Sequence, residues 1–262
     1  MAEYVLITGA SSGIGLEFAK IAASKSMNLI LLARNADKLV QLRTELEDTY
    51  SVKVLAVGCN LAEANIVEKV AALLHERCIV PDILINNAGF GVYGSFDQTD
   101  ANIEENMIQL NITLLTRLTK CIYQQMRSKG KGRILNVSSV AGFMAGPWMA
   151  VYHATKAYVL SFSEALAVEA KDTGVTVTAL CPGPTKTNFE NRASDGVGIK
   201  VFEKFGKLPT ARQVAEYGWK SKMKGKQGAV HGRKSRWLSF LIRFFPRKTI
   251  VNIAGKMQEQ SV

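Results

Sequence analysis

Short apolar runs alternate with amphipathic segments along most of this chain, and this alternation restricts its fold more than any other feature. Residues 29–33 read Leu-Ile-Leu-Leu-Ala, which is typical of a strand covered on both faces, as in a parallel sheet. Strands that alternate with helices imply right-handed crossovers and a doubly wound α/β sheet. The runs predicted as strands are residues 4–7, 29–33, 52–57, 82–85, 133–137, 175–180 and 228–230.

The segments between these runs carry apolar residues at helical spacing. Leu39, Leu42 and Leu46 illustrate the pattern, and long helices are predicted at about residues 101–128 and 152–171. With 262 residues and no low-complexity linker, the chain suits a single Rossmann-type domain. We expect a dinucleotide-binding and catalytic core at residues 1–190. Residues 191–262 are expected to form a substrate lid and a basic amphipathic extension of the same domain.

A glycine-rich stretch, Thr-Gly-Ala-Ser-Ser-Gly-Ile-Gly at residues 8–15, follows the first predicted strand. Glycines let the backbone turn sharply and approach a ligand closely. The helix that follows would direct unpaired N–H groups and the positive end of its dipole at a phosphate. The spacing is looser than Gly-x-Gly-x-x-Gly, so the motif alone is also compatible with a turn that binds nothing.

The end of the second predicted strand decides which dinucleotide fits. An acid at this point pairs with ribose hydroxyls, whereas arginine accommodates a 2′-phosphate. Here Ala33 is followed by Arg34, and no carboxylate is present to repel a phosphate. These residues predict NADP(H), the alternative being a solvated arginine at the start of a helix.

The carboxyl ends of the other strands carry small and polar residues, where ligands of open α/β sheets bind. Ser138 and Ser139 follow the fifth strand, and Tyr152 and Lys156 come next on a predicted helix. One turn apart, Tyr152 and Lys156 share a face, and a nearby ammonium would lower the pKa of a phenol. Ser139 could donate a hydrogen bond to a substrate oxygen. Ser138 is expected to be a strand-end hydroxyl and His153 a residue of the helix surface.

In order and spacing these motifs resemble the short-chain dehydrogenase/reductase family over roughly residues 4–190. The resemblance rests on residues 8–15, Asn-Asn-Ala-Gly at 86–89, Asn111, Ser139, Tyr-His-Ala-Thr-Lys at 152–156 and Pro-Gly-Pro-Thr-Lys-Thr at 182–187. Together they are highly specific, although each alone is not. The tail resembles that of the loosely characterised DltE-like members, which implies no particular substrate.

The resemblance implies a role for each matching residue. Tyr152 would exchange a proton with the substrate oxygen that Ser139 polarises, Lys156 would hold the nicotinamide ribose, and Asn111 would anchor a water that links Lys156 to solvent. Thr187 would meet the nicotinamide carboxamide, and residues 87–89 would line the adenine-ribose side. The full predicted cofactor set is Gly9, Ser11, Ser12, Gly13, Ile14, Gly15, Arg34, Asn60, Leu61, Asn87, Ala88, Gly89, Tyr152, Lys156, Pro182, Gly183, Thr185 and Thr187.

Two positions depart from the family pattern. Asn60 stands where the family often has aspartate, although an amide can still contact the adenine. Ser12 stands where NADP-preferring members often have a basic residue, so the NADP(H) prediction depends on Arg34 alone. No departure touches the catalytic set.

Cysteine spacing and hydropathy bear on location. The four cysteines have no metal-ligand or redox spacing, which suits a reducing compartment. No apolar run is long enough to span a bilayer, and the first predicted strand starts at Tyr4, so we expect no signal peptide. A cytoplasmic protein without a metal site is predicted, and peripheral contact with a membrane is left open.

The net charge of +11 is concentrated in the tail. Residues 200–262 contain 15 Lys and Arg against 3 Asp and Glu, whereas residues 1–199 contain 18 against 19. Residues 236–245, if helical, place Arg236, Ser239 and Arg243 on one side and seven large apolar residues over the rest. This face would pack on the protein or on a second subunit, or lie in an anionic membrane surface. The charge could also attract an acidic acyl carrier; nucleic-acid binding is not expected.

The sequence thus predicts an NADP(H)-dependent oxidoreductase that interconverts a carbonyl and a secondary alcohol. A hydrophobic ketone and a 3-oxoacyl compound are the candidate substrates. Family members commonly form dimers or tetramers through the helices that carry Asn111 and Tyr152, and the resemblance implies the same here. The alternative from another class is a nucleotide-binding sensor or membrane-associated scaffold with little turnover.

Overall fold

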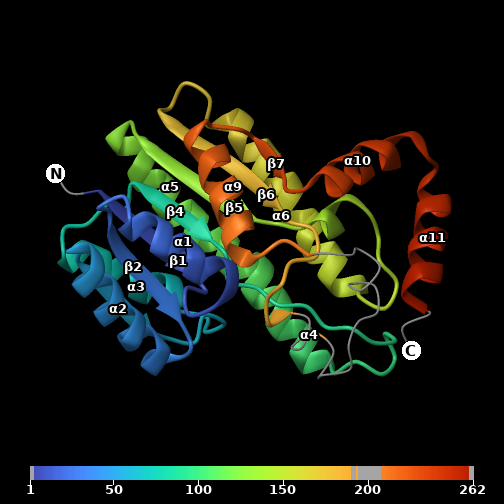
Figure 1. Cartoon of the computed structure of the whole chain (residues 1–262), viewed down its shortest axis with the longest axis horizontal. Coiled ribbons are helices and arrows are strands. Elements are labelled where there is room, and N and C mark those ends of the chain that lie inside the picture. Colours follow the sequence, from blue (N-terminus) through green and yellow to red (C-terminus); the bar gives the residue numbers. More distant parts are fainter. Residues whose placement is uncertain (1–2, 190–192, 194–207, 260–262) are drawn as a thin grey trace.

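Seven parallel strands form the centre of the molecule in a computed structural model that describes residues 3–189, 193 and 208–259 (Figure 1). Their order in the sheet is β3-β2-β1-β4-β5-β6-β7. The first crossovers run outward from β1 to β3, and the later ones run from β4 in the other direction, so the chain reverses beside β1. The strands are β1 (Tyr4–Thr8), β2 (Asn28–Ala33), β3 (Val54–Gly58), β4 (Ile83–Asn86), β5 (Gly132–Val137), β6 (Val175–Cys181) and β7 (Gly228–Val230). The doubly wound parallel sheet predicted from the sequence is confirmed.

Helices cover both faces of this sheet. One layer contains α1 (Gly13–Ala23), α2 (Ala36–Tyr50) and α9 (Ala211–Met223). The other contains α3 (Ile66–Glu76), α5 (Leu115–Lys129) and α6 (Ala150–Glu169). Strand β2 is buried at every residue: Leu29 and Leu31 join the apolar core under the first layer, and Ile30 and Leu32 join the core under the second. This alternation is what a strand covered on both faces requires.

The helix predicted at about residues 101–128 is interrupted. Helix α4 (Ala101–Ile108) passes into a π-helical turn, Gln109–Leu114, before α5 begins at Leu115. A π turn inserts one residue relative to the α-helical ladder and is often found at functional sites. Asn111 lies in this turn. The prediction of one continuous helix was wrong at this point because apolar spacing does not reveal one inserted residue.

Residues beyond 190 divide into two parts. Helix α9 and strand β7 complete the sheet and its first helical layer. The Thr210 hydroxyl accepts a hydrogen bond from the Gln213 N–H, and the Gln213 side chain accepts one from the Thr210 N–H. This reciprocal cap begins α9 where the sequence predicts. In the first part of this predicted extension, where the lid is expected, residues 191, 192 and 194–207 lie outside the described residues.

Helix α10 (Arg233–Leu241), a 3-10 turn at Ile242–Phe244 and helix α11 (Arg247–Glu259) project from one end of the molecule (Figure 1). We call these residues, 233–259, the C-terminal arm. Within the described parts of the chain, no helix combines the length and apolar character needed to cross a bilayer.

Candidate active site

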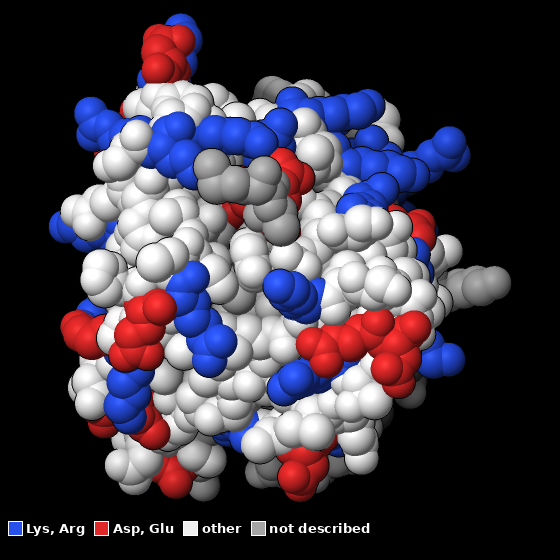
Figure 2. All heavy atoms as spheres, turned by 90° about the vertical axis from the view of Figure 1, so that its left-hand side faces the viewer, with Lys and Arg blue, Asp and Glu red and all other residues white. Residues whose placement is uncertain are grey.

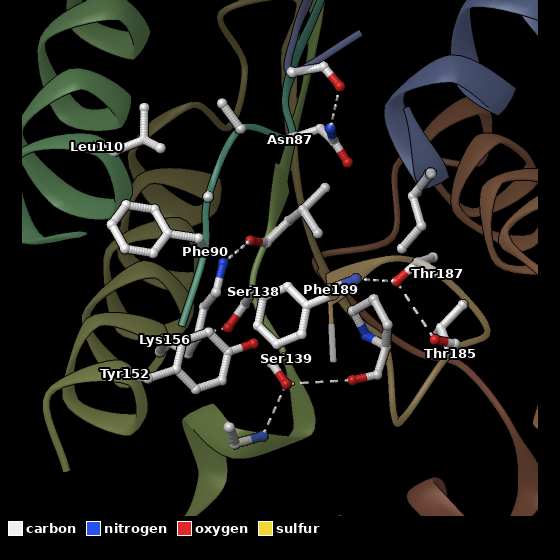
Figure 3. A pocket seen from close by; sticks show the side chains of 18 of the residues that line it. Asn87, Phe90, Leu110, Ser138, Ser139, Tyr152, Lys156, Thr185, Thr187 and Phe189 are labelled. Atoms are coloured by element: carbon white, nitrogen blue, oxygen red, sulfur yellow. Dashed lines mark hydrogen bonds between the residues drawn. The ribbon is translucent and has the colours of Figure 1, made fainter. Parts of the chain in front are cut away.

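A cleft with a cavity volume of about 960 Å³ opens beyond the carboxyl ends of the strands. The loops after six strands, β1 to β6, contribute to its walls, as the topology of an open α/β sheet requires. Of the residues predicted from the sequence, all but Asn111 and Gly15 line it. Figure 3 shows Ser139, Tyr152 and Lys156 at one end of this cleft and Asn87 at the other.

The glycine loop has the backbone that its sequence predicts. Gly9 and Gly13 have φ angles of 68° and 57°, in the left-handed region that favours glycine. Gly15 faces inward, and a Cβ there would collide with the Gly9 carbonyl oxygen. Gly15 therefore permits close packing of α1 on the loop and does not itself line the cleft.

The start of α1 fits a phosphate group. Ser12 is its N-cap residue, and the Ser12 side chain makes no capping hydrogen bond. N–H groups of the first turn thus have no side-chain acceptor and lie where an anion would be stabilised by them and by the helix dipole. Loop and helix together provide the cradle that the pyrophosphate of a dinucleotide needs.

Asn87 and Thr8 fix the loop to the neighbouring strand. The Asn87 side chain donates to the carbonyl oxygens of Thr8 and Gly9, at 3.1 and 3.2 Å. The Thr8 hydroxyl in turn accepts hydrogen bonds from the N–H groups of Asn87 and Ala88, both at 3.0 Å. These contacts hold the segment after β4 against the glycine loop. Asn87 therefore fixes the backbone of the loop that would cradle a phosphate.

Arg34 is exposed at the rim of the cleft, beside Asn35. Ser12 of the glycine loop lines the same cleft, and so do Asn60 and Leu61 after β3. No ion pair involves Arg34 among the described residues. Its guanidinium is therefore available to a phosphate, which it would bind with a planar, multiply donating fork.

Tyr152 directs its hydroxyl toward Ser139 (Figure 3). Burial raises the pKa of Tyr152 to about 12, and a hydrogen bond with Ser139 opposes this shift. The Ser139 Oγ accepts a hydrogen bond from the Ala141 N–H at 3.1 Å and donates to the Pro182 carbonyl oxygen at 3.4 Å. Tyr152 is therefore a neutral phenol at physiological pH, the form that can donate a proton.

Lys156 lies one turn beyond Tyr152 on α6, and both are buried. The Lys156 Nζ donates to the Val137 carbonyl oxygen at 2.9 Å and lies 5.8 Å from the centre of the Tyr152 ring. Burial lowers the pKa of Lys156 to about 8. The sequence predicts that Lys156 lowers the pKa of Tyr152; in this structure burial raises that pKa, and the opposing influence comes from Ser139.

Asn111 is buried behind the cleft wall and holds the segment after β4. Its Nδ2 donates to the Phe90 carbonyl oxygen at 2.9 Å and to the Thr155 Oγ1 at 3.0 Å. Its Oδ1 accepts from the Phe90 N–H at 3.2 Å. A Cβ on Gly89 would come within 2.8 Å of Asn111 Oδ1 and 3.4 Å of Lys156 Nζ. Asn111 is thus a positioning residue, and it reaches Phe90 from the π-helical turn.

Ser138 and His153 lie directly beside Ser139 and Tyr152 in the chain. Ser138 is a strand-end hydroxyl as predicted, and it donates to the Lys156 carbonyl oxygen at 2.8 Å. The prediction that His153 is a surface residue was wrong: the side chain is buried, and its Nδ1 lies 2.8 Å from the Met144 carbonyl oxygen. Burial lowers the pKa of His153. The neutral ring packs on Gly146, where a Cβ would collide with it.

Apolar residues that sequence reasoning did not identify complete the cleft. The Phe189 ring lies 5.4 Å from the Tyr152 ring. Gly91 faces the same cluster, and a Cβ there would come within 3.1 Å of Tyr152, Met149 and Phe189. Leu238 belongs to the C-terminal arm and still lines the cleft. No local motif marks these residues; only the topology brings them together. The apolar lining comprises Phe90, Ile103, Leu110, Val140, Met144, Met149, Phe189 and Leu238.

Comparison with known proteins matches the order of these elements to one family. The family model described as short chain dehydrogenase matches residues 3–198, which is most of the chain. The chain belongs to the short chain dehydrogenase family. The oxidoreductase class and the fold predicted from the sequence are therefore confirmed.

A solved relative extends the match to nearly the whole chain. The structure of a short-chain dehydrogenase from Sphingobium yanoikuyae in complex with NADPH superposes with a TM-score of 0.81, at 32% identity, over 91% of this chain and 92% of that one. The bound NADPH in that short-chain dehydrogenase agrees with the predicted cofactor.

Curated relatives differ in the class of substrate that their names give. An NADP-dependent 3-hydroxy acid dehydrogenase from Schizosaccharomyces pombe is 36% identical over 71% of this chain and 72% of its own length. The mouse (Mus musculus) 17-beta-hydroxysteroid dehydrogenase type 3 is 32% identical over 70% of this chain, but the match spans only 60% of the mouse protein. The relatives thus do not single out a substrate.

Proposed function

We propose that this short-chain dehydrogenase is an NADP(H)-dependent oxidoreductase that interconverts a carbonyl and a secondary alcohol. The observation that carries the proposal is the position of the Tyr152 hydroxyl. It lies beside Ser139 in the cleft that also contains the glycine loop, so a proton donor, a hydrogen-bond donor and a phosphate cradle share one cavity. This arrangement suits reduction of a C=O group.

The residues of the chain would act on the substrate oxygen. Bound NADPH supplies the hydride that reduces the carbonyl carbon. Tyr152, neutral because its pKa is about 12, donates its proton to the oxygen as negative charge develops there. Ser139 donates a hydrogen bond to the same oxygen. This donation leaves a phenolate, which a charged Lys156 nearby would stabilise, and the reverse reaction returns the proton to that phenolate.

Lys156 and Asn111 would have supporting roles. The Lys156 ammonium has three donors and uses one on the Val137 carbonyl, which leaves donors for the ribose hydroxyls of the nicotinamide half. Asn111 fixes the backbone at Phe90 and would thereby hold one wall of the nicotinamide site. Thr187, whose Oγ1 accepts from the Phe189 N–H at 3.2 Å, is placed by the same loop that carries Phe189 and would meet the carboxamide.

The choice of NADP(H) rests on Arg34. Its exposed guanidinium lies at the cleft rim, where the 2′-phosphate of the adenine ribose would lie, and no acidic side chain lines the cleft among the described residues. An arginine without a neighbouring carboxylate favours a dianionic phosphate over a neutral hydroxyl. Ser12 can add a hydroxyl donor from the glycine loop.

The cleft favours an uncharged, hydrophobic substrate. Around Tyr152 its described lining is mostly apolar apart from Ser138, Ser139 and His153, and the described cationic side chains that reach the cleft are Arg34 at the adenine end and Lys156. Among the described residues, a substrate with a carboxylate beside its carbonyl would find no free counter-charge near Phe189. We therefore propose a hydrophobic ketone or the acyl portion of a 3-oxoacyl compound.

Assembly and location complete the proposal. We propose a homodimer or homotetramer through α5 and α6, where Thr116 and Tyr158 form an exposed hydrogen-bonded pair and Val168 is exposed. The four cysteines are free in the structure, in keeping with a reducing, cytoplasmic location.

The basic arm would contact an anionic surface, either a membrane or an acidic acyl carrier. Residues 1–190 would supply the residues that bind the cofactor and carry out catalysis. Residues 191–262 would supply the lid and this surface.

A panel of carbonyl compounds would test the function. The purified protein would be assayed by NADPH absorbance with aliphatic and bulky ketones, steroids, sugars and 3-oxoacyl thioesters. Turnover of at least one hydrophobic carbonyl, with little or none of small carboxylates and sugars, is the expected result. If NADPH bound but no compound was reduced, the sensor or scaffold function would replace the enzyme.

A further inference from the structure

The C-terminal arm exposes its apolar side chains. Trp237, Phe240 and Leu241 are 64, 51 and 47% exposed, and Phe244 and Phe245 are 69 and 55% exposed. Serines take the inward positions instead, since Ser235 and Ser239 are buried. The sequence offers packing of the wide apolar face on the protein as one alternative; in the described part of the chain these five side chains are not covered. Contiguous exposed apolar residues of this size mark an interaction site.

The exposed rings form one continuous row. The Trp237 and Phe240 ring centres lie 6.4 Å apart, and those of Phe240 and Phe244 lie 5.1 Å apart, both edge to face. The row runs from α10 into the 3-10 turn without a break. It therefore presents a single apolar edge and not a scatter of isolated side chains.

Cations border this row, and acids are absent from it. Between Glu216 and Glu259 the sequence has no Asp or Glu. The basic residues of α10, the 3-10 turn and the start of α11 are exposed and form no ion pair within the described part of the chain: Arg233, Lys234, Arg236, Arg243, Arg247 and Lys248. On the opposite end of the molecule, by contrast, acidic side chains lie among the basic ones (Figure 2).

The arm is seated on the body through its inner face. A Cβ on Gly183 would come within 2.5 Å of the Ser235 Oγ, so α10 packs closely on the loop after β6. Leu238, the residue after Trp237, lines the cleft. One helix therefore forms part of the substrate wall on one side and the exposed aromatic row on the other.

We propose that the outer face of residues 233–248 binds the surface of an anionic lipid bilayer. The aromatic row would enter the boundary between headgroups and acyl chains, and the six cations would contact the headgroup phosphates. Charge complementarity favours this occupant over a second copy of the chain. A two-fold contact through this face would bring the two clusters of cations together, and like charges in contact are unfavourable.

The consequence for the enzyme rests on the proposed function. Because Leu238 and Trp237 are adjacent on α10, membrane docking would place the cleft beside the bilayer. A hydrophobic carbonyl compound dissolved in the lipid could then enter the cleft without crossing bulk water. The structure thus links the apolar cleft to a lipid-borne substrate pool.

Vesicle binding by the full-length protein tests the proposal without any need for turnover. Phosphatidylcholine vesicles would be compared with vesicles containing phosphatidylglycerol, by co-sedimentation and by tryptophan emission. Binding to the anionic vesicles, weakened by salt, and a blue shift are expected. Replacing Trp237, Phe240 and Phe244 together with serine should reduce binding at least tenfold. A Val40→Ser/Phe96→Ser variant, which alters exposed apolar residues outside the arm, should bind normally.

The charge contribution has its own variant. Arg243→Gln/Arg247→Gln/Lys248→Gln should weaken binding to the anionic vesicles on the order of a hundredfold. A matched control, Lys25→Gln/Lys38→Gln/Lys171→Gln, removes three exposed cations elsewhere and should have a much smaller effect. Thermal melting of each variant checks that it is folded.

Three outcomes would overturn the proposal. The first is equal binding to anionic vesicles by the wild type and by the ring variant, in which Trp237, Phe240 and Phe244 are replaced with serine. Failure of the wild type to bind vesicles, with an oligomer that the ring variant abolishes, would assign the face to a second copy. If the wild type failed to bind vesicles but bound an acyl carrier protein in a salt-sensitive way, the face would be assigned to an acidic protein. Vesicle binding without turnover of any carbonyl compound would contradict only the proposed function.

Discussion

The Asn111 side chain and the Phe90 backbone form a reciprocal pair of hydrogen bonds, N–H to Oδ1 at 3.2 Å and Nδ2–H to carbonyl oxygen at 2.9 Å. The pair joins the π-helical turn before α5 to the segment after β4. Gly89, which precedes Phe90, lies against Lys156. This wall of the cleft therefore depends on a side chain that does not itself line the cleft.

Replacement of Asn111 by alanine should reduce both stability and turnover. It leaves the N–H and carbonyl groups of Phe90 without these partners in a partly buried place, which costs about 1–3 kcal/mol in the free energy of unfolding. Denaturant unfolding and steady-state kinetics would measure the two effects. Asn102→Ala, an exposed residue of α4, is the control and should change neither. Full turnover in Asn111→Ala would contradict the positioning role.

Arg34→Glu should reverse the cofactor preference. A carboxylate would repel the 2′-phosphate and could accept hydrogen bonds from the ribose hydroxyls of NADH instead. The dissociation constant for NADPH should rise at least tenfold, while that for NADH should stay equal or fall. Lys38→Glu, one turn further along α2, is the matched charge change and should leave the preference intact. An Arg34→Glu variant that still favoured NADPH would remove the basis for assigning this cofactor.

Gly91→Ala should reduce turnover without a comparable loss of cofactor binding. The added methyl group would come within 3.1 Å of Tyr152, Met149 and Phe189, so it would press on the Tyr152 ring and displace it by a few tenths of an ångström. A displacement of the proton donor lowers kcat, by about tenfold or more. Gly228→Ala is the control because its Cβ would meet no atom within 4 Å. Unchanged kcat in Gly91→Ala would show that the Tyr152 ring has room to remain in place.

Lys222→Met should stabilise the protein at neutral pH. Lys222 is fully buried, its Nζ has no hydrogen-bond partner, and burial lowers its pKa to about 6, with Arg133 adding to the shift. Between pH 6 and 10.5 the unfolded chain binds a proton that the folded chain does not, so the stability of the wild type rises with pH across this interval. Methionine removes that penalty and should add about 1–3 kcal/mol at pH 7.

Denaturant unfolding from pH 6 to 10 would measure the effect of Lys222→Met. The gain should be largest at the acidic end and shrink toward pH 10. Lys224→Met, exposed in the next turn, should show no such trend. A loss of stability in Lys222→Met would mean that the ammonium stays charged over the Trp219 ring, whose centre lies 3.6 Å from Nζ.

The body of the fold could be predicted because its signals are local. Apolar runs such as Leu29–Ala33 require cover on both faces, and all seven strands occur where the sequence predicts them. Most of the cleft motifs could be predicted for the same reason, since they occupy strand ends, and Tyr152 and Lys156 could be predicted because one helical turn separates them on α6. Their roles in binding and catalysis remain predictions.

Features that depend on contacts between distant segments could not be predicted. The π-helical turn at Asn111 differs from an α-helix by one residue, which periodicity does not register. Burial of His153 depends on the loop that carries Gly146. The outward orientation of Trp237 could not be predicted either, because helical spacing defines a face but does not say which face meets the body. In the arm, the face that meets the body carries Ser235 and Ser239.

Turnover by Tyr152→Phe tests the central claim most directly. The variant keeps the ring and removes only the hydroxyl, so it should bind NADPH within about twofold of the wild type while kcat for carbonyl reduction falls by about a thousandfold. Tyr158→Phe, on the same helix but hydrogen-bonded to Thr116, should retain full activity. Loss of turnover in Tyr152→Phe with intact NADPH binding is the predicted result; near-normal turnover would contradict the account of this site.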